Sequence, residues 1–423
     1  MAHMRITDLK AHEILDSKGD PTIEVLVTLE NGLTAMSQVP SGSSTGSAEA
    51  FELRDNDGSR FFGKGVLQAV NNVNTEIKTA LIGQEVVNQA GLDQLLIQLD
   101  GTPNKTRLGG NALVGVSMAI CRAAAAAQGI ELYQYFGQLT GNTTFDMPLP
   151  QILIMEGGKH GNWATDIQEF TLIPSHQKFA TFREKLHAAA MVFHILGKAL
   201  NDKGYDAGVG FEGAYAPRQL QSNTEAFELI MYAIKRAGFE PGTDISIGID
   251  AAASEFFEIN HYVLKSEKGK QLATEQWLAQ LEAWANQYPI SSIEDAFHES
   301  EWPAWQALMQ KLGNRVQIIG DDLVTTNVTL IQKAIDLHAM NATLIKVNQI
   351  GTITETLAAI KLSDTAGFAS IISHRGGETN DDLIADMAVG TTANQSKFGG
   401  PDRGERLAKY NRLLRIENQL LGV

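Results

Sequence analysis

The stretch ISSIEDAF, residues 290–297, is a short apolar run that ends in two adjacent acids, Glu294 and Asp295. Short apolar runs with β-branched residues are typical of strands buried in a parallel sheet. Burying an unpaired carboxylate costs several kcal/mol or more, so a strand with this ending needs a compensating partner. The same ending recurs along the chain, and this recurrence predicts the fold.

Four further apolar strands end in polar, chemically capable residues: ISIGID (245–250), VQIIGDD (316–322), ATLIKVN (342–348) and ASIISHR (369–375). Helical patterns such as TEQWLAQLEAWANQY and VTLIQKAIDLHA separate these strands. Alternating strands and helices indicate βα units, and continuously apolar strands indicate a parallel sheet covered on both faces. We therefore expect an α/β barrel in the C-terminal part of the chain.

The N-terminal part has a different rhythm. The segments MRITDLKAHEIL and PTIEVLVTLENGLTAMSQV alternate like strands, with Asn31-Gly32 as a hairpin turn, and helical patterns follow them. A linker-like stretch, GQLTGNTTFDMPLPQ, lies near residue 140. We expect a small α+β domain over residues 1–140 and the barrel domain over residues 141–423. The start MAHM, residues 1–4, reads as an expression remnant.

Composition excludes several classes of function. The formal net charge of −15 lacks the basic footprint of a nucleic-acid-binding protein. The sequence has no signal peptide and no apolar run of the roughly 18 residues that a membrane span needs. One cysteine, Cys121, excludes an intrachain disulfide and a cysteine-based zinc site, and it fits a reducing cytosol.

The polar residues at the five strand ends are Asp250, Glu294, Asp321, Lys346 and His374, most of them about one βα unit apart. In a closed barrel they meet at the C-terminal mouth, where barrel enzymes place their chemistry. Three carboxylates without a histidine or cysteine partner favour a hard cation, and Mg²⁺ is our prediction. Cationic neighbours disfavour the charged form of Lys346, which makes it a candidate base.

The sequence resembles the enolase family over almost its whole length. The matching motifs, in chain order, are EILDSKGDPTIEV, VPSGSSTG, ELRD, LDGTPNK, QEFTLIP, IGIDAAASEF, SSIEDAF, IGDDLVTTN, LIKVNQIGT, SHRGGET and GERLAKYNRLLRIE. The resemblance implies an α+β N-terminal domain and an eight-stranded barrel. It also implies reversible dehydration of 2-phosphoglycerate to phosphoenolpyruvate. A lysine base beside Mg²⁺ is the known arrangement of the enolase superfamily.

The resemblance also implies roles for individual residues. Lys346 would remove the carbon-2 proton, and Glu212, with Glu169 beside it, would help protonate the leaving hydroxyl group. Two Mg²⁺ ions are implied, the first held by the three strand-end acids and the second partly by Ser41 in the SGSSTG loop. Substrate would be bound by His160, His374 and Lys397, and its phosphate group by Arg375. A homodimer or a larger homo-oligomer is implied as well.

Several positions depart from the family pattern: Phe211 replaces an aspartate, Ala214 a glycine, Gly376 a serine, Glu156 an asparagine, Ala296 a proline and Phe398 a threonine. The departures surround the site, so two alternatives stay open. One is a diverged relative that uses the same chemistry on another phosphorylated or phosphonate acid. The other is a catalytically weak protein with a binding or structural role.

Two other motifs have the residue spacing of known functional sites but not the sequence context that those sites need. GVGFEG, residues 208–213, has the glycine spacing of a dinucleotide-binding loop, but no apolar strand precedes it and no helix follows. GSSTG, residues 42–46, has the spacing of a nucleophile elbow but reads better as a flexible lid over the site.

Overall fold

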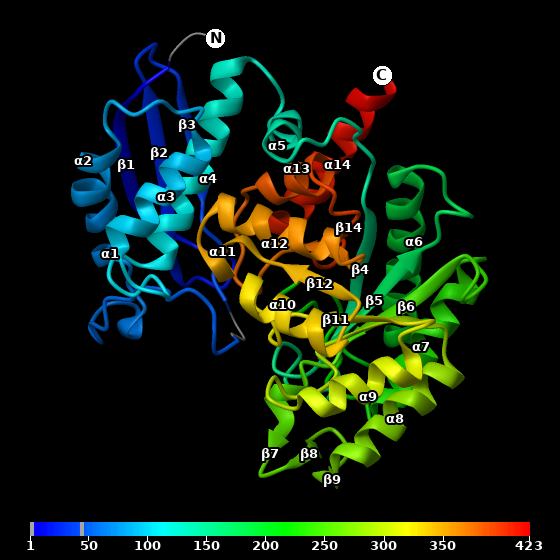
Figure 1. The fold of residues 1–423 in the computed structure, drawn as a ribbon. Coiled ribbons are helices and arrows are strands. Elements are labelled where there is room, and N and C mark those ends of the chain that lie inside the picture. Colours follow the sequence, from blue (N-terminus) through cyan, green and yellow to red (C-terminus); the bar gives the residue numbers. More distant parts are fainter. Residues whose placement is uncertain (1–3, 43–45) are drawn as a thin grey trace.

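The computed structural model describes residues 4–42 and 46–423. The predicted expression remnant and the predicted SGSSTG lid therefore lie partly outside the described residues. A small sheet with its helices stands beside a larger barrel (Figure 1). The predicted fold class, an α/β barrel with a smaller α+β domain, is confirmed. The boundary predicted at residue 140 stays a prediction.

The N-terminal sheet is antiparallel, in the order β1 (Ile6–Leu15), β2 (Pro21–Leu29) and β3 (Thr34–Gln38). Gly32, with a φ of 82°, forms the predicted turn between β2 and β3. The helical elements that follow are η1 (Phe61–Gly63), α1 (Leu67–Asn72), η2 (Val73–Ile77), α2 (Lys78–Leu81), α3 (Gln89–Asp100), α4 (Gly110–Gln128) and α5 (Leu132–Thr140).

Helix α4 is the core of this domain and packs on β2 and β3. Gly115 permits this approach, because a Cβ atom there would lie 2.9 Å from methyl groups of both Val25 and Val39. Among the described residues, α4 alone is long and apolar enough to cross a membrane, but 83% of its apolar window is buried within the protein. We therefore interpret α4 as a core helix.

Eight strands close the barrel in the order β10, β11, β12, β13, β14, β4, β5, β6. Their bounds are β4 (Leu149–Glu156), β5 (Glu169–Pro174), β6 (Ile245–Asp250), β10 (Ile290–Glu294), β11 (Gln317–Gly320), β12 (Ala342–Ile345), β13 (Ala369–Ser373) and β14 (Gln395–Lys397). The five strands that the sequence pattern predicts correspond to β6 and β10 to β13. Consecutive members of this set pair in parallel, as predicted.

Helices surround the barrel (Figure 1). They are α6 (Phe182–Asp202), α7 (Asn223–Arg236), α8 (Thr274–Gln287), α9 (Trp302–Leu312), α10 (Val328–Leu337), α11 (Val347–Ile350), α12 (Ile353–Thr365), α13 (Leu383–Gly390) and α14 (Gly404–Leu421). After β6, η3 (Ala253–Phe256) leads into a small antiparallel sheet of β7 (Phe257–Glu258), β8 (His261–Leu264) and β9 (Lys270–Leu272).

Strand β5 departs from the parallel arrangement of the barrel, because it is antiparallel to both of its neighbours, β4 and β6. Its first residue, Glu169, is therefore in register with the last residues of the adjacent strands, Glu156 and Asp250. A side chain at the start of β5 thus reaches the same mouth as the side chains that end the parallel strands.

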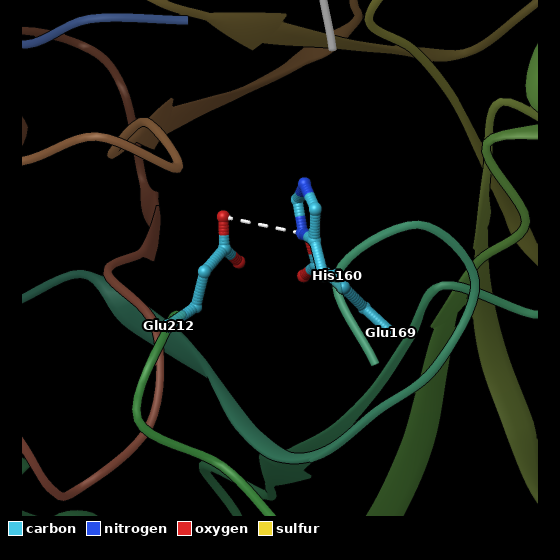
Figure 2. Close-up of side chains that lie close together, drawn as sticks. All are labelled: His160, Glu169 and Glu212. Atoms are coloured by element: carbon cyan, nitrogen blue, oxygen red, sulfur yellow. Dashed lines mark ion pairs between the residues drawn. The ribbon is translucent and has the colours of Figure 1, made fainter. Parts of the chain in front are cut away.

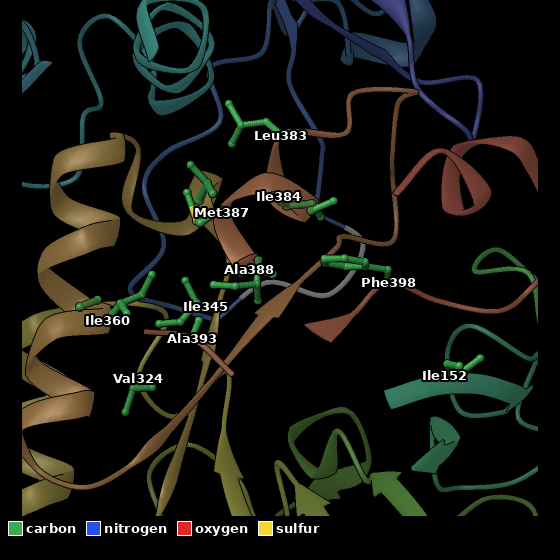
Figure 3. Packing of buried hydrophobic residues seen from close by; sticks show 14 of the residues in the cluster. Ile152, Val324, Ile345, Ile360, Leu383, Ile384, Met387, Ala388, Ala393 and Phe398 are labelled. Atoms are coloured by element: carbon green, nitrogen blue, oxygen red, sulfur yellow. The ribbon is translucent and has the colours of Figure 1, made fainter. Parts of the chain in front are cut away.

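Apolar packing holds this frame rigid. Helix α13 is buried along its whole length, and Leu383, Ile384, Met387 and Ala388 pack in the core together with Phe398 (Figure 3).

Between the two domains, buried Asp93 accepts hydrogen bonds from Ser117 on α4 and from Thr354 on α12. These contacts fix the N-terminal domain beside the mouth of the barrel.

Candidate functional site

A cavity opens at the C-terminal mouth of the barrel. The predicted site residues that line it are His160, Glu169, Glu212, Asp250, Asp321, Lys346, His374, Arg375 and Lys397. Two predicted residues, Glu294 and Ser41, are buried beside it without lining it. Residues that the prediction did not assign also line the wall: Gln168, Ala252, Asp295, Asp322, Ser373 and Gly376.

Lys397, the last residue of β14, binds three of the predicted acids. Its Nζ lies 3.0 Å from Glu169 Oε2, 3.3 Å from Asp250 Oδ2 and 2.8 Å from Glu294 Oε2. Burial alone would lower the pKa of Lys397, but the three carboxylates outweigh burial and raise it well above its ordinary value. Lys397 is therefore a charged ammonium group that compensates the buried acids of β5, β6 and β10.

The candidate base, Lys346, follows β12, is partly buried and forms an ion pair with buried Asp321. The expectation that a bound metal and other cations lower the pKa of Lys346 concerns the metal-bound site and stays a prediction. Burial does lower the pKa of Lys346, but Asp321 outweighs burial and raises it. The charge of Asp321 therefore favours the ammonium form of Lys346 in this pair.

Glu212 lies between two imidazoles. Its carboxylate oxygens are 3.5 Å from His160 Nδ1 and 3.4 Å from His374 Nε2, and Figure 2 shows Glu212 facing His160 and Glu169. Burial lowers the pKa of His374 to about 3 and also lowers that of His160, although Glu212 opposes both shifts. Both imidazoles are therefore neutral in the neutral pH range.

The same neighbours decide the charge of Glu212. Burial would raise its pKa, but the hydrogen bond from His374 and the positive charge of Arg406 favour the carboxylate, and the pKa lies well below its ordinary value. Glu212 is therefore a carboxylate in the resting site. It has to gain a proton before it can donate one.

Arg406 on α14 is a site residue that the sequence analysis missed. Its Nη1 donates to His374 Nδ1 at 2.6 Å and to the carbonyl oxygen of Arg375 at 2.5 Å. A guanidinium group only donates, so Nδ1 of His374 accepts and the ring proton is on Nε2, facing Glu212. Arg406 lies within the motif GERLAKYNRLLRIE, but no local pattern in the sequence indicates that α14 reaches the barrel mouth.

Two clusters of the described residues bring metal-binding atoms within 4.8 Å of one another: His160, Glu169 and Glu212, and Asp295, Asp321 and Asp322. Only the second is built entirely of carboxylates, which suits a hard cation such as Mg²⁺. This second cluster contains Asp321, one of the three predicted ligands of the first Mg²⁺. The other two, Asp250 and Glu294, accept hydrogen bonds from Lys397. Glu294 Oε1 has no hydrogen-bond partner among the described residues, so the predicted set retains a buried oxygen that a cation would satisfy.

The predicted phosphate-binding residue, Arg375, forms a two-pronged ion pair with Glu49 of the N-terminal domain. The distances are 2.9 Å from Nη1 to Oε2 and 3.1 Å from Nη2 to Oε1. Ser41, the predicted ligand of the second Mg²⁺, is tied nearby through two backbone hydrogen bonds to Gly377, while its hydroxyl group donates to Asp16. The two domains thus meet beside the predicted phosphate position.

The departures from the family pattern have different surroundings. Phe211 does not line the cavity and is 44% exposed, whereas Gly376 lines the cavity wall. Glu156 is fully buried and binds the backbone of Glu212 and Ala214. The remaining three, Ala214, Ala296 and Phe398, are fully buried.

Two family models match the chain. Residues 6–136 match the model described as "Enolase, N-terminal domain". Residues 144–422 match the model described as "Enolase, C-terminal TIM barrel domain". Together the two matches cover nearly the whole chain.

Proposed function

The chain belongs to the enolase family of lyases, and on this premise we propose that it dehydrates 2-phosphoglycerate reversibly to phosphoenolpyruvate with the help of Mg²⁺. One observation supports the proposal above all: a single cavity is lined by a partly buried lysine, a buried glutamate and two further cationic side chains. The lysine and the glutamate can serve as base and acid. Arg375 and Lys397 suit a substrate that carries both a carboxylate and a phosphate group.

In the proposed reaction, neutral Lys346 removes the proton from carbon 2, and the electrons of that C–H bond remain on carbon 2. Glu212 then delivers a proton to the hydroxyl group on carbon 3. The C–O bond breaks, water leaves, and the electron pair forms the double bond of phosphoenolpyruvate. Glu212 gains its proton most readily when the substrate is bound, because an adjacent anion favours the protonated carboxyl group.

The other residues bind and orient. Neutral His374, held by Arg406, presents Nε2–H toward Glu212. Arg375 would exchange its carboxylate partner, Glu49, for the substrate phosphate, since both are anions that suit the guanidinium fork. Glu169, whose pKa is raised by burial, can hold a proton beside Glu212.

The residues present fit Mg²⁺, since buried carboxylates surround the cavity and Glu294 Oε1 lacks a partner among the described residues. Asp250, Glu294 and Asp321 would hold the first ion, and Ser41 would contribute to the second. Bound Mg²⁺ would supply positive charge at the substrate carboxylate. Asp321 would then be less available to the ammonium group of Lys346, and this would favour the neutral form of that lysine.

The direct test is the absorbance of phosphoenolpyruvate formed from 2-phosphoglycerate, measured with Mg²⁺ and with chelator. Mg²⁺-dependent formation would support the proposal. If no product forms at any Mg²⁺ concentration, the assigned reaction is wrong. A panel of related phosphorylated and phosphonate acids belongs beside it. Gly376 favours this second candidate, a diverged relative, because it replaces a hydroxyl-bearing side chain in the cavity wall.

We also propose that the protein is a homodimer or a larger homo-oligomer in the cytosol, as the resemblance and the single cysteine imply. Sedimentation velocity of the purified protein tests the assembly. A monomer at micromolar concentration would contradict it.

A further inference from the structure

Glu156 ends strand β4 and is fully buried, but it does not line the cavity. Its Oε1 accepts hydrogen bonds from the backbone N–H groups of Glu212, at 3.0 Å, and Ala214, at 2.9 Å. Its own backbone N–H donates to the carbonyl oxygen of Tyr215 at 2.8 Å. One residue at the end of a barrel strand thus binds the turn that carries the proposed acid.

The charged groups that face Glu156 are Glu212 on this turn, Arg406 on α14 and Glu169, its register partner on β5. Burial and the charge of Glu212 raise the pKa of Glu156 to about 8, although the two backbone donors and Arg406 oppose the shift. At pH 7 its carboxyl group is therefore mostly protonated. Because Oε1 already accepts two hydrogen bonds, the proton is on Oε2, for which the described residues provide no partner.

We propose that Glu156 is a positioning residue for Glu212: its buried carboxyl group fixes the turn through the backbone N–H groups of Glu212 and Ala214. This inference rests on the proposed function and deepens it, because it assigns to Glu156 the orientation of the acid. In the neutral form Glu156 binds this turn without placing a second negative charge beside Glu212.

The surroundings of the turn support this role. Gly400 donates to the carbonyl oxygen of Glu212 at 2.7 Å, and Arg406 donates to that of Phe211 at 3.1 Å. These contacts satisfy the carbonyl groups, whereas Glu156 satisfies the N–H groups of Glu212 and Ala214. Without Glu156, both donors lose their acceptor in a buried site, so the turn and the Glu212 side chain lose their fixed orientation.

The test compares Glu156→Gln and Glu156→Ala in the full-length protein with Mg²⁺. Glutamine keeps an acceptor for both N–H groups and cannot ionise, whereas alanine removes the acceptor. We expect Glu156→Ala to lower kcat by about 10- to 100-fold, with KM for 2-phosphoglycerate changed less than about twofold, because Glu156 does not line the cavity. We expect Glu156→Gln to retain kcat within about threefold at neutral pH.

The matched control is Gln151→Ala, on the same strand. Gln151 is also buried, but its amide group donates to Gln395 at 3.0 Å and does not line the cavity. We expect Gln151→Ala to lower the melting temperature, while kcat stays within about twofold of that of the original protein. An equal loss of kcat in this control would show that Glu156→Ala acts only through general destabilisation, and it would overturn the proposal.

The pH profile separates positioning from a purely structural role. The original protein should lose kcat/KM as pH rises through about 8, where Glu156 ionises beside Glu212, and Glu156→Gln should lack this step. An unchanged step in Glu156→Gln, or full kcat in Glu156→Ala, would overturn the proposal.

A readout without turnover separates failure of this inference from failure of the proposed function. A group whose pKa is raised on folding stabilises the fold less as pH rises from its unfolded value toward its folded value. The melting temperature of the original protein should therefore fall more steeply between about pH 5 and about pH 8 than that of Glu156→Gln. Equal slopes would refute the inference even if phosphoenolpyruvate forms. Different slopes in a protein without this activity would support the buried, neutral Glu156 and reject only the assigned reaction.

Discussion

Replacing Lys397 by methionine removes the cation that pairs with three buried acids of the site. Its ammonium group lies within 3.3 Å of oxygens of Glu169, Asp250 and Glu294, and all four side chains are at least 90% buried. Methionine has a similar length and no charge. The variant therefore leaves three buried carboxylates without their common partner while it changes the packing little.

The expected cost follows from breaking a buried ion pair, about 3–5 kcal/mol of unfolding free energy. Total stabilities of domains are about 5–15 kcal/mol, so Lys397→Met should remain folded but be clearly weakened. Burial already raises the pKa of Glu294 and Glu169, and loss of Lys397 should raise both further. Since acids with a raised pKa stabilise the fold less as pH rises, the loss should be larger at about pH 8 than at about pH 5.

The assay is urea unfolding at both pH values, with Lys235→Met as the control on the exposed side of α7. The control should change the unfolding free energy by less than about 0.5 kcal/mol. Mg²⁺ at 100 times its dissociation constant should restore up to about 2.7 kcal/mol of the loss, because a cation can replace the ammonium group. A loss below about 1 kcal/mol, or a larger loss at the lower pH, would refute the reasoning.

Three further predictions concern the metal, the fold and the substrate. Mg²⁺ should raise the melting temperature of the protein, and Asp321→Ala should remove most of that shift; an equal shift in the variant would move the metal elsewhere. Gly115→Ala should cost about 1–3 kcal/mol in urea unfolding, because its Cβ atom would lie 2.9 Å from Val25 and Val39; an unchanged midpoint would contradict the packing of α4. Gly376→Ser should lower KM for 2-phosphoglycerate by about 10- to 100-fold, since a hydrogen bond to a charged group contributes about 1.5–3 kcal/mol. Loss of activity on the best substrate of the panel would instead indicate that Gly376 makes room for a different group.

The barrel and five of its polar residues could be predicted because each parallel strand carries its own signal. An apolar run that ends in a chemically capable residue identifies both the strand and the end that reaches the mouth. This rule found Asp250, Glu294, Asp321, Lys346 and His374 without any knowledge of the contacts between strands. All five lie at or beside the C-terminal mouth, where Lys346 is partly buried and the other four are buried.

The rule is incomplete at β4 and β5. Glu169 begins its strand, so a strand-end rule would place it at the opposite mouth; it reaches the site only because β5 is antiparallel to its neighbours. Glu156 ends the apolar strand LPQILIME in the same manner as Glu294 ends its own. The signal for Glu156 was therefore present, although the sequence analysis treated it only as a departure from the family pattern.

The pairing of charges could not be read from the sequence. Arg406 reaches His374 across 32 positions of the chain, and Lys397 reaches Asp250 across 147. Such contacts depend on the closure of the barrel, which no local pattern encodes. For the same reason, the ion pair between Lys346 and Asp321, which raises the pKa of Lys346, could not be predicted from the sequence.

The central claim is that Lys346 removes the carbon-2 proton and Glu212 assists departure of the hydroxyl group. Exchange of the carbon-2 proton of 2-phosphoglycerate with deuterated solvent, followed by NMR with Mg²⁺ present, tests it most directly. We predict that the original protein exchanges this proton, that Lys346→Ala abolishes exchange while remaining folded, and that Glu212→Gln retains exchange but forms no phosphoenolpyruvate. Exchange that persists in Lys346→Ala would contradict the account and assign the base to another residue.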